Sequence, residues 1–570
     1  MGPLIVVVLG LVAVAGVRAL SDRVGVAAPL LLVLLGVGVS LVPGVPAIEV
    51  DPEWVLAGIL PPLLFSSAVA MPVMDFRRAF GAVSGLSVVL VVVSALVIGL
   101  LLDLVVPGLG LAAGVALGAI LSPTDAAATA IVRRLGVTSR VVTVLDGEGL
   151  LNDATALVLL RAAIAAIAAG AAGAVSVSVG GVLGQFALAV AVAVVLGVVV
   201  GRVGLLVRGR VRDPTVNTLL SFATPFVASL PAEALGASGL VSAVAAGLVT
   251  GHGAARRLTP QHRLSDTENW RTVELVLEGT IFLLMGLELT RVLEDLERDG
   301  ASWGAGLALA AGALVATLVL RAAYVTPLVL AVRASARRGT TVRAHLRDMD
   351  ERLAAGEAIT IRGRTVSLPG PRRMARFRDR LRLRIADIDY FRSAPLGPRE
   401  GVVVVWAGMR GAVTVAAAQT LPTTTPDRSL LVFVAFSVAT ASLLLQGGTL
   451  ALVVRRVAPA RAELASPAER AELLDRLMAV NREVLDRHAD EPEIAAFRER
   501  LADRDERPDP ALASQGRIAV RLEMIEGQRA ALLAARDEGT FTSAALATLL
   551  ENLDAEQISI ELRGRVVDPG

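Results

Sequence analysis

An acidic residue inside a long apolar stretch is the most informative feature of this sequence. Residues 145–158 read LDGEGLLNDATALV, and they place Glu148, Asn152 and Asp153 among small and apolar residues. Glu148 and Asn152 share one face of a helix, while Asp153 is rotated by about 100° from Asn152. Burial disfavours the charged carboxylate, so at Asp153 a proton would compete with a hard cation. A group that holds either a proton or a cation, but not both, is sufficient for exchange when access alternates between two sides.

An alternative place for Asp153 is a helix end among lipid headgroups. Arg140 and Asp146 precede it and already mark the inner boundary of this helix. We therefore favour the mid-membrane position, where an ionisable residue is costly and by default marks a functional site.

A second helix offers further oxygen atoms for a cation. The segment GVALGAILSPTDAAATAIVRRLG has Ser122, Pro123, Thr124 and Asp125 in its middle. Pro123 cannot donate its amide and disturbs the preceding turn. Carbonyl groups freed at membrane depth are tolerated only where they are buried in protein or line a wet cavity. We expect an interrupted helix here.

A matching interruption is indicated by VVVVWAGMRGAVTVAAAQ, where Gly408, Arg410 and Gly411 stand inside an apolar segment. The two interrupted helices are seven helices apart in our count, so they cross the membrane in opposite directions, as in an inverted repeat. Interrupted helices at corresponding positions of two halves are the best sequence pointer to the binding site of a transporter.

Composition determines the elements that position these residues. The chain has 570 residues, of which 54% are hydrophobic and 19% charged, against about 45–50% and about 25% in soluble domains. Apolar runs long enough to cross a bilayer, about 18 residues or more, recur up to residue 455. We predict an all-α polytopic membrane protein with about thirteen transmembrane helices. The expected ranges are 3–20, 25–43, 54–72, 80–103, 109–135, 147–169, 178–208, 214–231, 236–251, 270–292, 302–332, 400–421 and 428–455.

The loops between these ranges are alternately rich in arginine. By the positive-inside rule, this puts the N-terminus outside and the C-terminal tail in the cytoplasm of a multi-pass protein of the plasma membrane. The transmembrane domain, 1–455, contains a polar cytoplasmic insertion at 333–398. Residues 459–570 have apolar positions at helical spacing and predict a soluble helical tail, which is either a folding or dimerisation appendage or a regulatory element.

Several classes of function are disfavoured. The chain has no cysteine and only four histidines, without an HExxH motif, so we expect no transition-metal site and no cofactor. It has no GxxxxGK[ST] loop for ATP. The arginine-rich stretches lack interleaved aromatic residues and adjoin apolar runs, so we expect membrane lipid and no nucleic acid as a partner. We expect a transporter and not an enzyme.

Five segments together resemble the monovalent cation:proton antiporters of the NhaP and eukaryotic sodium/proton exchanger type. In order they are LPPLLFSSA (60–68), SPTDAAA (122–128), LDGEGLLNDATALV (145–158), FLLMGLEL (282–289) and WAGMRGAV (406–413). The resemblance implies a secondary active antiporter that exchanges sodium, potassium or lithium for protons and supports pH homeostasis. It also implies a homodimer with crossed unwound helices, in which a six-helix core moves like an elevator against an interface domain.

Roles carried over from the family fall on matching positions of this sequence. Asp153 would bind the proton or the monovalent cation, and Asn152 would stabilise the site without charge. Thr124 would offer an oxygen to the ion, and Asp125 would offset the helix N-termini that meet at the crossing. The resemblance further implies that Arg410 balances helix C-termini and pairs with Glu148, and that an Asn-Asp pair exchanges one cation for one proton electroneutrally.

Two positions depart from the family's pattern. Many members have Ser where this chain has Gly149, and many have Glu where it has Ser66, which keeps a hydroxyl but no charge. The cation preference is therefore open, with a potassium-preferring exchanger as one alternative and a cation channel or sensor regulated by the tail as another. Glu274 and Glu278 are expected near the inner surface, either paired with Arg271 or lining a vestibule.

Overall fold

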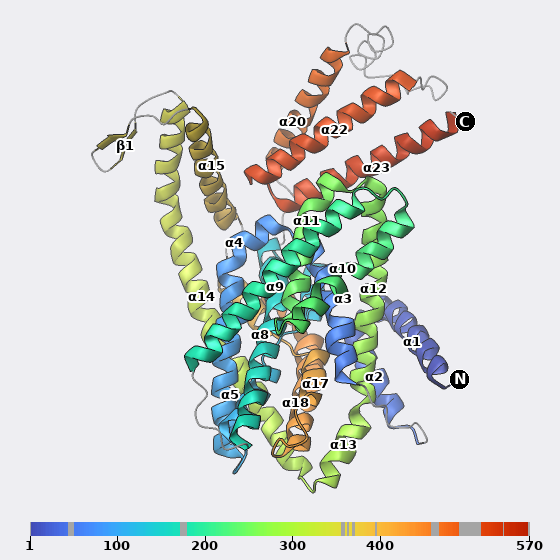
Figure 1. The fold of residues 1–570 in the computed structure, drawn as a ribbon. Helices are drawn as coiled ribbons and strands as arrows, with labels where there is room; N and C mark the ends of the chain where they lie inside the picture. The colour runs from blue at the N-terminus through green and yellow to red at the C-terminus, as the bar shows by residue number, and fades with distance from the viewer. Residues whose placement is uncertain are drawn as a thin grey trace. The chain divides into compact units, whose positions relative to one another are not determined.

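The computed structural model is helical throughout the membrane part of the chain, as the apolar runs predict (Figure 1). The described strands are β1 (Ile359–Ile361) and β2 (Arg364–Val366), which form a small antiparallel hairpin within the polar insertion. The structure describes residues 2–43, 51–171, 179–354, 359–361, 364–366, 371–393, 396–457, 467–488, 515–539 and 541–567.

The first half of the chain contains two long helices that change into π-helices along their length. Its elements are α1 (Gly2–Val24), α2 (Ala28–Ser40), η1 (Trp54–Ile59), α3 (Leu60–Ala70), α4 (Val73–Ser84), η2 (Gly85–Leu90), α5 (Val91–Val105), α6 (Leu111–Ile120), α7 (Ala127–Arg134), α8 (Ser139–Ala171), α9 (Val179–Arg208), α10 (Pro214–Ala234) and α11 (Gly239–Arg257).

The second half repeats the alternation of long and broken helices and ends in the polar tail. Its helices are α12 (Pro260–Leu287), α13 (Leu289–Arg298), α14 (Trp303–Ala354), α15 (Pro371–Ser393), α16 (Pro398–Trp406), α17 (Ala412–Gln419), α18 (Arg428–Ser442), η3 (Leu443–Gly447), α19 (Gly448–Val457), α20 (Pro467–Arg487), α22 (Gln515–Glu538) and α23 (Ser543–Val567).

Each of the thirteen apolar ranges coincides with one helix or with consecutive helices. By length and apolar composition alone, six helices in the described part of the chain can cross a membrane. Three shorter apolar helices cover 28–40, 54–70 and 111–120. The number of crossings therefore remains a prediction, whereas the all-helical membrane fold is confirmed.

Two helices extend well beyond their apolar stretches. α8 begins at Ser139 and not near 147, and α14 continues past residue 333 to Ala354, into the polar insertion. Hydropathy detects where a helix leaves an apolar environment, but a helix continues for as long as its backbone hydrogen bonds are favourable. The sequence pattern therefore located these spans but not the ends of their helices.

Contacts along the chain divide it into two compact units. One unit contains residues 1–258, 262–333 and 396–462, and thus the membrane helices. The other contains 259–261, 334–395 and 463–570, so the insertion and the tail cluster together. In the tail, α20 packs on α22 and α22 on α23 (Figure 1), around buried side chains that include Leu473, Ile525, Leu532 and Leu546.

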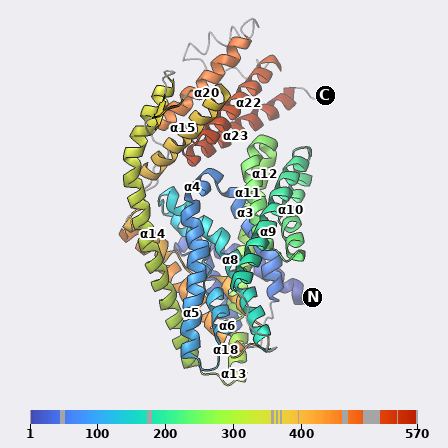
Figure 2. The ribbon, with the colours of Figure 1, turned by 60° about the vertical axis from the view of Figure 1, so that its left-hand side comes forward.

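Two groups of helices make up the membrane unit. In one group α3, α9, α10 and α11 pack on one another. In the other, α4 and α5 lie along α8, and α6 packs against both α5 and α8 (Figure 2). α17 joins this second group through its contacts with α6 and α18.

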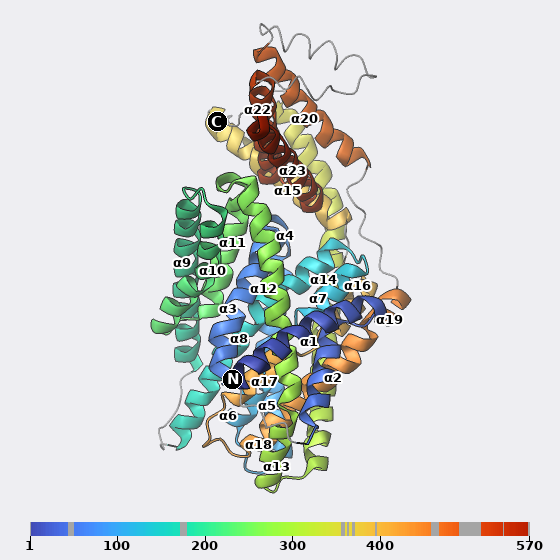
Figure 3. The ribbon, with the colours of Figure 1, turned by 90° about the vertical axis from the view of Figure 1, so that its right-hand side faces the viewer.

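α12 is lined on one side by the two N-terminal helices, α1 and α2 (Figure 3). Val14 of α1 packs against Gly279, where a β-carbon would collide with its methyl groups. α2 comes closest at Gly36 and Gly286, where a β-carbon on Gly36 would lie 2.5 Å from the carbonyl oxygen of Leu283. Small residues permit this near contact between backbones, as is usual between membrane helices.

This contact can be tested by two alanine substitutions on the same helix. Gly36→Ala should lower the free energy of unfolding by about 1–3 kcal/mol because backbone atoms of α12 cannot give way as a side chain could. Gly38→Ala is the control, since a β-carbon there meets nothing within 4 Å. Thermal unfolding of detergent-purified protein measures both, and equal midpoints for the two variants would contradict the close packing.

Candidate functional site

The two interruptions expected from the sequence are present, and they contact each other. The chain leaves helical geometry between α6 and α7 at residues 121–126, and between α16 and α17 at 407–411. The backbone N–H of Asp125 donates to the carbonyl oxygen of Met409 at 2.8 Å, which joins the two unwound segments directly. Four helix ends therefore meet inside the membrane unit.

Two glycines allow this crossing to form. A β-carbon at Gly411 would coincide with the carboxylate of Asp125. A β-carbon at Gly408 would overlap the side chain of Arg321, which enters from α14. Any larger residue at either position would displace a charged side chain from the crossing.

Charged side chains complement the helix ends on both sides of the crossing. Asp125 accepts a hydrogen bond from the N–H of Ala127 at 2.8 Å, and so caps the N-terminus of α7. Arg410 donates from Nε to the carbonyl oxygen of Leu121 at 2.8 Å, at the C-terminus of α6, and from Nη1 to the carbonyl oxygen of Gly408. A carboxylate at N-termini and a guanidinium at C-termini are the favourable arrangement for the helix dipoles.

Asn152 of α8 and Thr124 of the first interruption are joined directly. The Asn152 Nδ2 donates to Thr124 Oγ1 at 2.7 Å, and Thr124 Oγ1 donates to Glu148 Oε1 at 3.1 Å. The other side-chain atom of Asn152, Oδ1, is buried and has no hydrogen-bond partner among the described residues. One amide oxygen is therefore free at the centre of the unit.

Asp153 lies beside this group with its carboxylate uncommitted. The side chain is 7% exposed, and no described residue donates a hydrogen bond to it. Its charge interacts unfavourably with that of Asp125. A buried carboxylate in this position is costly to ionise alone, so it favours a proton or a bound cation.

The expected pair between Glu148 and Arg410 is wrong. Glu148 is paired with Arg321 of α14, whose Nη2 lies 2.8 Å from Oε2 and whose Nη1 donates to Oε1. The guanidinium of Arg410 donates instead to backbone carbonyl oxygens at helix C-termini. The position beside Glu148 is occupied by Arg321. Arg321 also donates from Nε to the carbonyl oxygen of Val404 at 3.0 Å.

Arg321 was not among the site residues predicted from the sequence, although the sequence contains a signal for its role. The residue stands alone within the apolar range 302–332, and an arginine at membrane depth requires a carboxylate partner. Glu148 was already assigned to Arg410, and sequence alone could not show which arginine approached it.

Residues 9–456 match the model of a protein family whose description is sodium/hydrogen exchanger (transmembrane). The chain belongs to the sodium/hydrogen exchanger family. It is therefore a membrane transporter and not an enzyme, and its activity is cation/proton antiport.

Individual relatives agree with this assignment. The exchanger is 29% identical to an uncharacterized Na+/H+ exchanger of Mycobacterium bovis, over 98% of this chain and 96% of the relative. It is 30% identical to a sodium, potassium, lithium and rubidium/H+ antiporter of Bacillus pumilus, over 48% of this chain and 41% of the relative. The sodium proton antiporter MjNhaP1 of Methanocaldococcus jannaschii shares its fold, with a TM-score of 0.52 at 17% identity over 79% of this chain and 97% of that structure.

Ser66, expected from the resemblance to offer a hydroxyl to the ion, has a partner on α12. Ser66 is buried on α3, and its hydroxyl donates to Oε1 of Glu274 on α12. Arg271, the partner that we considered for Glu274, pairs instead with Glu268 at 3.3 Å on the exposed side of the helix. The hydroxyl at position 66 is therefore engaged by a carboxylate from another helix.

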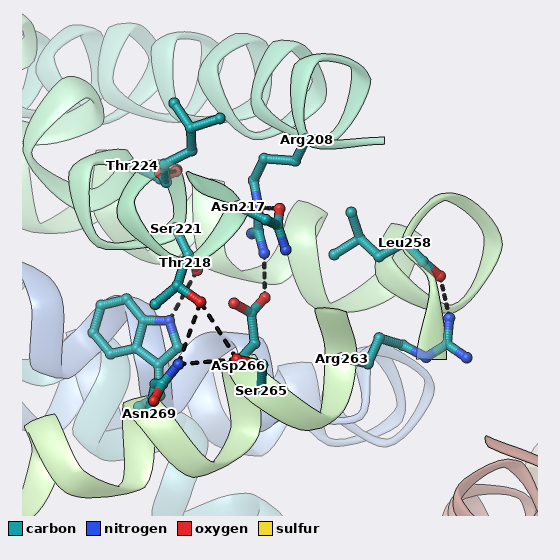
Figure 4. A network of polar contacts seen from close by, with 12 residues as sticks. Arg208, Asn217, Thr218, Ser221, Thr224, Leu258, Arg263, Ser265, Asp266 and Asn269 are labelled. Atoms are coloured by element: carbon teal, nitrogen blue, oxygen red, sulfur yellow. Dashed lines mark hydrogen bonds and ion pairs between the residues drawn. The ribbon is translucent and has the colours of Figure 1, made fainter. Parts of the chain in front are cut away.

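A second buried charge pair holds the beginning of α12 in the exchanger (Figure 4). Arg208, at the end of α9, is 2% exposed; its Nη2 pairs with Asp266, and its Nε donates to Oδ1 of Asn217 at 2.8 Å. The sequence pattern shows that Arg208 lies at a helix end but does not reveal its burial. Nearby, Asp213 caps α10 by accepting from the N–H groups of Val216 and Thr215, and these bonds hold the pKa of Asp213 below its usual range.

The Glu148–Arg321 pair gives a stability prediction. Arg321→Met should destabilise the protein by about 3–5 kcal/mol, because it leaves the Glu148 carboxylate buried without its partner. The double variant Glu148→Gln, Arg321→Met should recover part of this loss. Thermal unfolding in detergent measures both variants against the parent protein.

Arg298→Met provides the control for this test. Its ion pairs with Glu294 and Asp295 are exposed and should contribute no more than about 1 kcal/mol. A parent-like midpoint for Arg321→Met would contradict the structural role of the buried pair.

Proposed function

We propose that the exchanger carries one sodium, potassium or lithium ion across the plasma membrane in exchange for one proton, with Asp153 as the group that binds them in turn. The observation that carries this proposal is the state of Asp153. It is buried beside the crossing of two interrupted helices and receives no hydrogen bond from any described residue. A carboxylate held for structure would be hydrogen-bonded, as Glu148 is.

Oxygen atoms around Asp153 suit an unhydrated monovalent cation. Asn152 Oδ1 has no partner among the described residues, and Thr124 lies within hydrogen-bond distance of the same amide. Asp125 adds negative charge nearby. When the cation leaves, a proton on Asp153 removes the unfavourable charge, so occupation by one ion excludes the other.

The neutral side chain at position 152 supports electroneutral exchange. Asp153 changes its occupant, while Asn152 has no charge to change and Glu148 is held by Arg321 in a bidentate pair. One carboxylate that carries either a cation or a proton moves the same net charge in both directions. Imposing a membrane potential should therefore leave the transport rate unchanged.

Alternating access would come from movement of one helix group against the other. We assign α4–α8, α14 and α16–α19 to the moving core, which contains the crossing, and α1–α3 with α10–α12 to the interface domain of a homodimer. The extensive packing of α3, α10 and α11 on one another supports this division. The basic loops support an outside N-terminus and a cytoplasmic tail.

Asp153→Asn should abolish exchange, because an amide can neither take up the proton nor neutralise the cation. Protein in proteoliposomes with an internal pH-sensitive dye should respond to added sodium or potassium, and the variant should give no response at any cation concentration. Asp103→Asn, on α5, is a charge-matched control outside the crossing and should retain exchange. Cation-dependent proton movement in Asp153→Asn would disprove the role of this carboxylate.

Gly149 offers a test of cation preference. It precedes Asp153 by four residues and therefore lies on the same side of α8. A β-carbon there meets nothing within 4 Å, so the site has space in which a potassium-preferring exchanger could hold its larger ion.

Gly149→Ser should raise the transport of sodium and lithium relative to potassium, because the hydroxyl adds an oxygen ligand and reduces the space. Apparent KM values for the three cations, measured in the same proteoliposomes, test this. Gly149→Ala is the control that adds bulk without oxygen. An identical selectivity change in both variants would contradict coordination by the new hydroxyl.

A further inference from the structure

The second interrupted helix replaces one backbone hydrogen bond that a continuous helix would have. In an α-helix each N–H donates to the carbonyl oxygen four residues earlier, so the N–H of Arg410 would donate to the carbonyl oxygen of Trp406. These two groups flank the unwound turn at 407–411. Each of them bonds instead to a side chain from the helix that follows.

Ser442 and Gln446 occupy the place of the missing bond. The N–H of Arg410 donates to Ser442 Oγ at 2.9 Å, and Nε2 of Gln446 donates to the carbonyl oxygen of Trp406 at 3.1 Å. The hydroxyl of Ser442 donates to Oε1 of Gln446 and so connects the two side chains. Together they satisfy the donor and the acceptor that the interruption separates, and we call them the Ser442–Gln446 bridge.

The bridge is buried and has a local structure of its own. Both residues are 0% exposed, so water does not compete for their hydrogen bonds. Ser442 is the last residue of α18, and Gln446 lies in the π-helix η3 that follows it. π-helices are rare and frequently occur at functional sites. The amide of Gln446 uses both its donor and its acceptor in the bridge, as a buried amide must.

The first interruption depends on the second through Arg410. In a continuous helix the N–H of Asp125 would donate to the carbonyl oxygen of Leu121. Here the N–H of Asp125 donates to the carbonyl oxygen of Met409 at 2.8 Å, and the carbonyl oxygen of Leu121 accepts from Arg410 Nε at 2.8 Å. The second unwound turn therefore replaces the broken bond of the first helix, while the bridge replaces that of the second.

We propose that Ser442 and Gln446 are positioning residues of the exchanger and that the bridge keeps both interruptions open. Without it, the direct bond between the N–H of Arg410 and the carbonyl oxygen of Trp406 can re-form, and the unwound turn becomes helical. Rewinding this turn would withdraw Met409 and the guanidinium of Arg410 from the first interruption.

The ion-binding site would be affected through the first interruption. Asp125 and Thr124 belong to that segment, and Thr124 Oγ1 accepts from Asn152, next to Asp153, at 2.7 Å. This step rests on the proposed binding of the ion at Asp153. A form that does not bind the cation lowers the apparent affinity by the fraction of protein that remains open. A saturating cation concentration should restore the rate.

Transport kinetics in proteoliposomes test the bridge. Gln446→Met keeps the length of the side chain but removes its hydrogen-bonding groups, and Ser442→Ala removes the hydroxyl. Each should raise the apparent KM for sodium or potassium about two- to tenfold, the effect of one net hydrogen bond, with the maximal rate retained. A purely structural role would instead lower the maximal rate through loss of folded protein and leave KM unchanged.

Thr449→Val is the matched control. Thr449 Oγ1 accepts from Nε1 of Trp406 at 2.9 Å, so this variant removes a hydrogen bond to the same residue without touching the unwound backbone. Its KM should equal that of the parent. KM values for Gln446→Met and Ser442→Ala equal to that of Thr449→Val would overturn the proposal.

The double variant Ser442→Ala, Gln446→Met tests whether the two residues act as one unit. Its KM should not exceed that of the more impaired single variant, because either substitution already breaks the bridge. Effects that multiply would contradict a shared role. Size-exclusion profiles and unfolding midpoints verify folding, and Ser442→Ala, the smaller change, carries the test if Gln446→Met does not fold.

An electron cryomicroscopy structure of Gln446→Met gives a readout that does not depend on transport. We expect the N–H of Arg410 to bond directly to the carbonyl oxygen of Trp406. A turn that stays unwound as in the parent would overturn the proposal. The proposed function fails separately, by exchange that persists in Asp153→Asn, so each hypothesis can be rejected while the other stands.

Discussion

The structure depends on one constraint, which is that backbone groups freed inside a membrane must find partners within the protein. Two helices stop at mid-depth here, and their four ends meet at a single crossing. Asp125 satisfies N-terminal donors and Arg410 satisfies C-terminal carbonyls. Gly411 leaves room for the carboxylate of Asp125, and Gly408 leaves room for the side chain of Arg321. The crossing is thus stabilised by fixed charges.

The buried charges divide into those that are fixed and one that is free to change. Glu148 is held by Arg321 and also accepts from Thr124, so its ionisation supports the position of the interrupted helix. Arg208 and Asp266 fix the beginning of α12 in the same way. Asp153 has no such partner among the described residues. Our proposal for Asp153 rests on this contrast more than on burial, because Glu148 is buried as well.

Sequence could predict the helical membrane fold and its two interruptions because both depend on local signals. Pro123 and the glycines around Arg410 mark the interruptions within a few residues, and apolar length reveals the helices. The partners could not be predicted in the same way. Arg321 is far along the chain from Glu148, and several arginines were available to it. Ser66 donates its hydroxyl to Glu274 of α12, a partner that no local pattern records.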